Sequence, residues 1–344
     1  MATQLNPPAS ISMMSDFGIV ESVSKCLAPK LEELRGKKIV FSADDKSLVP
    51  VDGWGLKAGG SPYCATATIT TFKPIRENTM VAAIDSSSIK MAETEEGALY
   101  AIKCGVAVAY GGAALMHFKI GPMLFYLSES TVYDSELDDR LARLVLADSD
   151  VARRLVRVRA ERAIQHELSG HFRNAIILVD GSLRSSVFED RRGSGGRSMT
   201  RIAENCTLYR NLLVGISKNT KLKILERAAA PLAKVPGPAY VDVDVIIKSL
   251  VKGSVGSSLM AKLDRNSPVL RADIVGDREQ ALGRLLGNDP VASGYPETLR
   301  LAHHISTFTA TEVTCLRSHV LNSYGVTELA ADDIRRTLLG SIMV

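Results

Sequence analysis

The sequence has few cysteines, and they are not arranged to bind a metal or one another. The five cysteines are odd in number, widely spaced and never arranged as C-x-x-C: Cys26, Cys64, Cys104, Cys206 and Cys315. Zinc sites and disulfide frameworks need paired cysteines at characteristic spacings. This absence excludes both, and it indicates reduced cysteines in the core of a folded protein.

Long apolar runs are also missing. No run reaches the ~18 to 20 residues that a membrane span requires, and residues 1–15 lack the basic and then apolar segments of a secretory signal. The chain has 344 residues, of which 46% are hydrophobic. We therefore expect a folded globular protein of one large or two smaller domains, located in the cytoplasm.

Two familiar enzyme motifs are approached but not completed. His166 and His171 are five residues apart, whereas the two histidines of a helical zinc protease motif are four apart. The glycines of 193–196 are not followed by Gly-Lys-Ser or Gly-Lys-Thr, so they do not form a P-loop. The sequence also contains no internal repeat.

Basic residues are clustered although the net charge is only +4. One cluster falls in a predicted helix and the other follows a predicted strand: Arg153, Arg154, Arg157, Arg159 and Arg162, and then Arg184, Arg191, Arg192, Arg197 and Arg201. Such clusters indicate a polyanionic substrate. The alternative is that they form ordinary solvated faces of a helix and a loop.

An unbroken apolar run, residues 175–179, ends at Asp180-Gly181-Ser182. A run without a polar face is typical of a strand buried on both sides of a sheet. The carboxyl end of such a strand is the usual place for ligand chemistry, although Asp180 could instead only cap a turn. Residues 81–85 repeat the pattern and end at Asp85, followed by three serines. Two carboxylates are thus expected to meet at one site.

The order of predicted elements is that of an RNase H-like core, an α/β fold with a mixed central sheet flanked by helices. In chain order we predict strands at 81–85, 99–110 and 115–127 with a turn at Gly111-Gly112, a helix at 135–169, the strand at 175–179, a helix at 199–212 and a strand at 213–217.

Further elements are predicted on both sides of this core. They are an amphipathic helix at 15–35, a glycine-rich loop at 189–197, a hairpin at 258–263 and 269–275, a loop at 290–295, a helix at 298–321 and a final amphipathic helix at 329–342.

A third carboxylate is expected from the long helix. Phosphodiester cleavage by two metal ions needs oxygen ligands that converge from different elements. Glu161 lies beside the apolar stripe of the helix, where a carboxylate is costly to bury unless it is paired or bound to metal. An ion pair with an arginine would explain it as well. Glu167 is the alternative, on a different helix face.

Two adjacent histidines, His303 and His304, lie in the predicted helix at 298–321. A histidine there is able to ligate Mn²⁺ or to shuttle a proton, but a structural or exposed histidine is equally consistent with the pattern. The choice between the two stays open.

Taken in order, these segments resemble the NurA nucleases. The resemblance rests on Val81-Ala-Ala-Ile-Asp-Ser-Ser, Arg159-Ala-Glu161, Leu178-Val-Asp-Gly-Ser-Leu183, Val214-Gly-Ile-Ser-Lys218, Lys262-Leu with Leu270-Arg, and Gly294-Tyr-Pro with Leu301-Ala-His303. It covers residues 81–305. No single motif is specific, but six occur in register.

The resemblance implies a Piwi-like variant of the RNase H fold and a Mn²⁺-dependent nuclease, with Mg²⁺ as an alternative metal. Enzymes of this family cut single-stranded DNA internally and degrade single and double strands from the 5′ end. They are homodimers that act with the hexameric ATPase HerA in DNA end resection.

By the same resemblance, Asp85, Glu161, Asp180 and His303 match the metal-binding residues, and Tyr295 matches a tyrosine of the catalytic site. Arg157, Arg184 and Lys218 are candidates for contacting DNA, although an ordinary exposed lysine at the end of a strand would explain Lys218 equally well. The family often has glycine after the first aspartate, where this chain has Ser86. This departure could change the local turn without removing the ligand.

Two other functions share the fold. Actin-like ATPases and sugar kinases duplicate the core, and residues 220–344 show no second set of its elements. A non-catalytic scaffold for DNA or an ATPase would not need the four site residues together. For domain organisation, we expect a peripheral region at 1–80 and a nuclease domain at 81–344, with the core at 81–220 and a C-terminal part at 221–344 that completes the site.

Overall fold

The computed structural model describes residues 30–42, 68–134, 137–189, 197–218 and 223–329. The strands are β1 (Lys38–Phe41), β2 (Ile69–Thr71), β3 (Met80–Glu93), β4 (Gly97–Tyr110), β5 (Ala113–Ser128), β6 (Ile176–Asp180), β7 (Leu212–Ser217), β8 (Ala239–Asp242), β9 (Ser257–Lys262), β10 (Leu270–Val275), β11 (Val291–Ala292), β12 (Tyr295–Pro296) and β13 (Thr327–Glu328).

Within these described ranges, a short 3-10 helix and nine α-helices lie between and around the strands. In chain order these are η2 (Leu31–Leu34), α2 (Glu129–Tyr133), α3 (Asp139–Ala147), α4 (Ser149–His171), α5 (Met199–Leu208), α6 (Lys223–Ala233), α7 (Asp244–Leu250), α8 (Arg278–Asn288), α9 (Glu297–Ser306) and α10 (Ala310–Tyr324). Within the described ranges, no helix is long and apolar enough to cross a membrane.

The centre of the sheet has the strand order β5-β4-β3-β6-β7. β3, β4 and β5 form an antiparallel meander, whereas β3, β6 and β7 run parallel to one another. This is the RNase H-like, Piwi-like α/β arrangement predicted from the sequence. Antiparallel strands β10, β9, β8 and β2 extend the sheet beyond β7, and β1 and β13 extend it beside the far end of β3.

The predicted meander is confirmed, and its strands are longer than the patterns indicated. β3 and β4 have 14 residues each and β5 has 16. Gly111 and Gly112 form the turn between β4 and β5 with φ of +60° and +83°, a left-handed conformation that glycine adopts at little cost. The second predicted hairpin is confirmed as β9 and β10.

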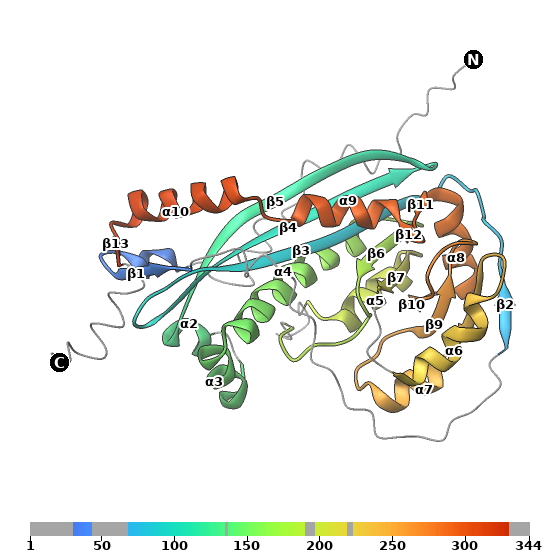
Figure 1. Ribbon diagram of the computed structural model, residues 1–344, viewed down its shortest axis with the longest axis horizontal. Helices are drawn as coiled ribbons and strands as arrows, with labels where there is room; N and C mark the ends of the chain where they lie inside the picture. Colours follow the sequence, from blue (N-terminus) through green and yellow to red (C-terminus); the bar gives the residue numbers. More distant parts are fainter. Residues whose placement is uncertain (1–29, 43–67, 135–136, 190–196, 219–222, 330–344) are drawn as a thin grey trace, which may run out of the picture.

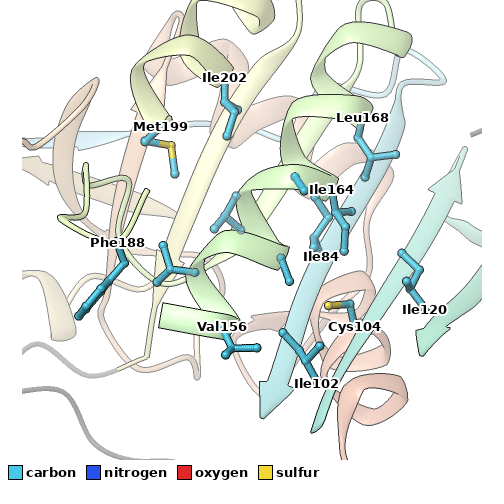
Figure 2. Close-up of a cluster of buried hydrophobic side chains, with 14 of the residues drawn as sticks. Ile84, Ile102, Cys104, Ile120, Val156, Ile164, Leu168, Phe188, Met199 and Ile202 are labelled. Carbon is cyan, nitrogen blue, oxygen red and sulfur yellow. The ribbon is translucent and has the colours of Figure 1, made fainter. Parts of the chain in front are cut away.

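Helices cover the two faces of this sheet (Figure 1). On one face α4 packs on the side chains of β3 and β4 that point toward it, including Ile84 and Ile102, and α5 packs beside α4 against β7 and β10 (Figure 2). On the other face α9 packs through Leu299 and Ala302 onto Val81 and its neighbours. Because side chains alternate along a strand, consecutive residues of β3 contact different helices.

The predicted helix at 135–169 is wrong as a single element, because the chain is divided into α3 and α4. Asp148 lies between them in an extended conformation, and its carboxylate accepts hydrogen bonds from the backbone N–H groups of Asp150 and Val151. An aspartate that caps a helix in this way begins a new helix instead of continuing the old one.

Three other boundaries differ from the prediction for similar local reasons. The helix predicted at 199–212 ends at Leu208, before Arg210 with its positive φ. The helix predicted at 298–321 is divided into α9 and α10, because Thr309 and Glu312 form a capping box. The segment predicted as a loop at 290–295 contains the short hairpin of β11 and β12.

Several predicted elements lie largely outside the described residues. They are most of the helix at 15–35, whose described end is the 3-10 helix η2, the helix at 329–342 after Leu329, and the centre of the loop at 189–197.

α9 lies unusually close to the sheet because β4 has glycine at the point of contact. A Cβ atom on Gly105 would lie 2.3 Å from the carbonyl oxygen of Ala302 and 3.0 Å from the backbone nitrogen of Ser306. Gly105 is the partner of Asp85 in the antiparallel pair. The glycine therefore brings α9 against β3 and β4 at the position of Asp85.

The junction of α9 and α10 is held by a buried lysine. Lys103 of β4, whose side chain is 6% exposed, donates hydrogen bonds to the Thr307 carbonyl at 2.8 Å and to Glu312 Oε2 at 2.9 Å. Lys119 and the Thr309 backbone N–H also donate to the Glu312 carboxylate. Burial opposes ionisation of Glu312, but these donors outweigh it and lower the pKa to about 2.

We expect Gly105→Ala to destabilise the protein by about 1 to 3 kcal/mol, because the contacted atoms are backbone and α9 must shift. Gly170→Ala is the matched control, since no atom lies within 4 Å of the added Cβ and alanine favours a helix. Urea unfolding measures both. Equal free energies of unfolding for the two variants would contradict the close-packing account.

We expect the stabilisation by Glu312 to depend on pH. Its folded pKa lies below the ordinary value of 4.5, so the contribution is complete above about pH 5 and is lost as the pH falls toward 2. The difference in free energy of unfolding between wild type and Glu312→Gln should thus be about 1 to 2 kcal/mol at pH 7 and shrink in acid. A difference that does not change with pH would contradict this assignment.

Candidate metal centre

Asp85 and Asp180 lie side by side because β3 and β6 are parallel neighbours. Ile84 pairs with Val179 in this ladder, so the next residue of each strand is an aspartate. Asp180 ends its strand, whereas β3 continues for eight residues beyond Asp85. The Asp85 side chain is 12% exposed and that of Asp180 is 21% exposed. The sheet thus places two carboxylates at one partly shielded point.

α9 brings a histidine and a serine to the first carboxylate. His303 Nδ1 lies 2.7 Å from Asp85 Oδ2, and Ser306 Oγ donates to the same oxygen at 3.0 Å. The hydrogen bond to Asp85 raises the pKa of His303, against the opposing effect of burial. Of the two candidate histidines, His303 is therefore the one in contact with Asp85.

The second carboxylate is fixed by two donors. Tyr295 Oη donates to Asp180 Oδ1 at 3.0 Å, and Lys218 Nζ donates to Oδ2 at 3.0 Å. The ammonium of Lys218 also lies 4.6 Å from the centre of the Tyr295 ring. Burial and the nearby Asp180 raise the pKa of Tyr295 well above its ordinary value. The phenol therefore stays protonated at neutral pH and remains a donor.

The turn after Asp180 is supported from below by β7 and β10. Gly181 has φ of +112°, and its carbonyl oxygen would lie 2.6 Å from a Cβ on Gly215. The buried carboxylate of Asp273 accepts a hydrogen bond from the Leu183 backbone N–H at 3.0 Å and another from Ser258 Oγ at 2.7 Å. A glycine and a buried acid thus hold the turn in a fixed position.

Glu161 lies close to this group but on the other face of the sheet. It projects from α4 and accepts a hydrogen bond from Ser86 Oγ at 2.5 Å. Burial raises the pKa of Glu161, and the nearby Arg157 and Arg162 oppose this rise. Because Ser86 follows Asp85 on β3, the two side chains point to opposite faces. The serine that departs from the family pattern therefore contacts the third predicted carboxylate.

Asp85, Asp180 and His303 together form a group that fits a divalent cation. One ligand atom from each lies within 4.8 Å of the other two. Two carboxylates and one imidazole nitrogen suit Mn²⁺, which accepts oxygen and nitrogen ligands. In the described part of the chain, neither Glu161, Glu167 nor His304 belongs to this group.

The two arginines predicted to contact DNA lie on α4 and on the segment that follows β6. Arg157 Nε lies 3.8 Å from Glu161 Oε1, and the Arg184 Nε donates to the Lys252 carbonyl at 3.1 Å. Lys218 pairs with Asp180 in this structure, and its contact with DNA stays a prediction.

Sequence reasoning did not identify the serines of the site. Ser306 is three residues after His303, and residues three apart share a helix face. That spacing was the available signal. For Ser86, the signal was its place next to Asp85, on the face turned toward α4.

The sequence and the fold of this chain are both similar to those of NurA proteins. The family model described as the NurA domain matches residues 80–307. Among solved structures, the chain is similar to the NurA nuclease from Sulfolobus solfataricus, with 17% identity, 73% of this chain and 86% of that chain covered, and a TM-score of 0.44.

A NurA structure bound to dAMP and manganese is 10% identical, with 73% and 90% covered and a TM-score of 0.41. The catalytic domain of human endonuclease V is 13% identical, with 72% and 85% covered and a TM-score of 0.31. A search of curated proteins gave no significant match. The NurA domain model spans about two thirds of the sequence, including all the residues of the candidate centre, and the chain belongs to the NurA family.

Proposed function

We propose that this protein is a Mn²⁺-dependent DNA nuclease of the cytoplasm. It cuts single-stranded DNA internally and degrades single- and double-stranded DNA from the 5′ end. In this proposal it is a homodimer that works with a HerA-type hexameric ATPase in DNA end resection and double-strand break repair. Membership of the NurA family supports a metal-dependent nuclease.

The observation that carries the proposal is the convergence of Asp85, Asp180 and His303 within 4.8 Å. These residues are far apart in the sequence, and the fold brings them together at one edge of the parallel strands. Two carboxylates in this position repel each other unless a cation or donors neutralise them. A site for a divalent cation explains why both are kept there.

The side chains around the carboxylates orient them. Tyr295 and Lys218 bind different oxygens of Asp180, so its carboxylate cannot rotate freely. For Asp85, His303 and Ser306 both bind Oδ2. A divalent cation held by these residues would supply charge stabilisation at the phosphate and lower the pKa of a water molecule. Tyr295 and Ser306 act in this scheme as positioning residues.

Glu161 completes the proposed set of carboxylates. Its side chain is 17% exposed, and it lies near enough to Asp85 for their charges to interact. The hydrogen bond from Ser86 holds Glu161 on the α4 face of β3, beyond the end of β6 at Asp180, so that strand does not separate it from Asp85. We propose that Glu161 supplies the third ligand, which a second metal ion in this centre would require.

The alternative functions have less support. Actin-like ATPases duplicate the core, whereas β8, β9 and β10 continue the one central sheet in the described part of this chain. A scaffold without activity would have no need for the pairing of Asp180 with both Tyr295 and Lys218. A scaffold is the function that would be favoured if the wild-type protein did not cleave DNA.

We expect the wild-type protein to cleave end-labelled single- and double-stranded DNA when Mn²⁺ is present. When EDTA replaces Mn²⁺, cleavage should be weak or absent. Asp180→Asn and Glu161→Gln should each lower the rate at least about 100-fold, because each removes a proposed ligand of the cation. Mn²⁺ should raise the unfolding temperature of wild type but not of Asp180→Asn.

Glu167→Gln is the matched control, since it changes a glutamate of the same helix outside the group. It should retain the rate of wild type. The absence of cleavage by wild type, alone and with a HerA-type ATPase, would overturn the nuclease and favour the scaffold. Full activity of Glu161→Gln would remove that residue from the site.

A further inference from the structure

Two buried arginines clamp the segment after β6 onto α4. Arg162 Nε donates to Glu189 Oε1 at 2.9 Å, and its Nη2 donates to the carbonyl of Arg184 at 3.3 Å. Arg159 Nε donates to the carbonyl of Phe188 at 3.2 Å. The residues Arg159 and Arg162 are only 4% and 6% exposed. The path of residues 184–189 is therefore fixed across the helix.

This clamp brings Arg184 near Arg154 of α4, and Arg157 lies on the same helix near Arg154 as well. Arg154 and Arg184 are exposed, and the guanidinium of Arg154 lies 5.9 Å from the centre of the Phe188 ring. Among the described residues, no carboxylate forms an ion pair with Arg154 or Arg184. Arg157 is 3.8 Å from Glu161, and its Nε has no hydrogen-bond partner in the same set.

The three positive charges disfavour one another. Although the Arg154 residue is exposed as a whole, partial desolvation of its guanidinium lowers its pKa, and the charges of Arg157 and Arg184 lower the pKa further. Like charges at short range cost free energy unless an anion lies between them. Planar guanidinium groups bind phosphate with paired hydrogen bonds. The cluster therefore has the chemistry of a phosphate site.

The cluster also borders Glu161, the third ligand in the proposed function. Arg157 is one helical turn before Glu161 on α4, and Arg184 is four residues after Asp180. Relying on the proposed nuclease function, we infer that Arg154, Arg157 and Arg184 form a subsite for one phosphate of the DNA backbone, beside the phosphate that is cleaved. The subsite recognises charge and geometry and is indifferent to the base.

Binding to single-stranded DNA in EDTA tests this subsite without any cleavage. The dissociation constant is measured by fluorescence anisotropy at several salt concentrations. Each phosphate contact contributes roughly 0.7 to the slope of log affinity against log salt. Arg154→Gln should weaken binding several-fold for every sequence and reduce the slope by about that amount. Arg154→Lys should recover part of both losses.

Arg210→Gln is the matched control. Arg210 is also exposed, but it precedes β7. Because β6 and β7 are parallel, it lies at the amino end of these strands, whereas Asp180 lies at their carboxyl end. The Arg210→Gln variant should bind single-stranded DNA with the same slope of log affinity against log salt as the wild type. An unchanged slope for Arg154→Gln, or an equal loss in Arg210→Gln, would overturn the subsite.

Two further arms separate the possible explanations. If the cluster holds free phosphate and not DNA, inorganic phosphate will stabilise wild type more than Arg154→Gln while the DNA slopes stay equal, and this outcome also overturns the proposal. Failure of the nuclease function is seen separately, as the absence of cleavage by wild type with Mn²⁺. Loss of folding in Arg154→Gln is excluded by comparing its unfolding temperature with that of wild type.

Discussion

The carboxylates of Asp85 and Asp180 lie side by side because β3 and β6 are parallel and in register at Ile84 and Val179. The arrangement is costly when it stands alone, since like charges at close range repel. The surrounding structure compensates this cost with donors: His303 and Ser306 for Asp85, and Tyr295 and Lys218 for Asp180. The elements that surround β3 and β6 position these four donors.

The second half of the chain contributes these donors. The hairpin of β11 and β12 presents Tyr295, and α9 carries both His303 and Ser306. α9 can lie against the sheet because Gly105 has no side chain, and Ser87 hydrogen-bonds the carbonyl of Ser306. The RNase H-like core thus supplies the acids, and the C-terminal elements supply the groups that orient them.

Local patterns in the sequence were sufficient for the core. An apolar run that ends in an acid identified β3 and β6, and element order identified the fold. The division between α3 and α4 was missed because a helical apolar pattern continues across Asp148, where capping decides the outcome. The hydrogen bond between Ser86 and Glu161 joins residues 75 positions apart. The hydrogen bond from the Leu183 backbone N–H to the buried Asp273 joins residues 90 positions apart. Such contacts depend on the packing of α4 and β10 on the sheet, which local periodicity does not encode.

The central claim is that Asp85, Asp180 and His303 hold a divalent cation. The most direct measurement is the anomalous scattering of Mn²⁺ in crystals of the wild-type protein grown with this ion. The account predicts a peak within ligand distance, about 2.0 to 2.3 Å, of oxygens from both aspartates. A Mn²⁺ ion bound only elsewhere, with Asp85 still hydrogen-bonded to His303 and Asp180 to Lys218, would contradict it.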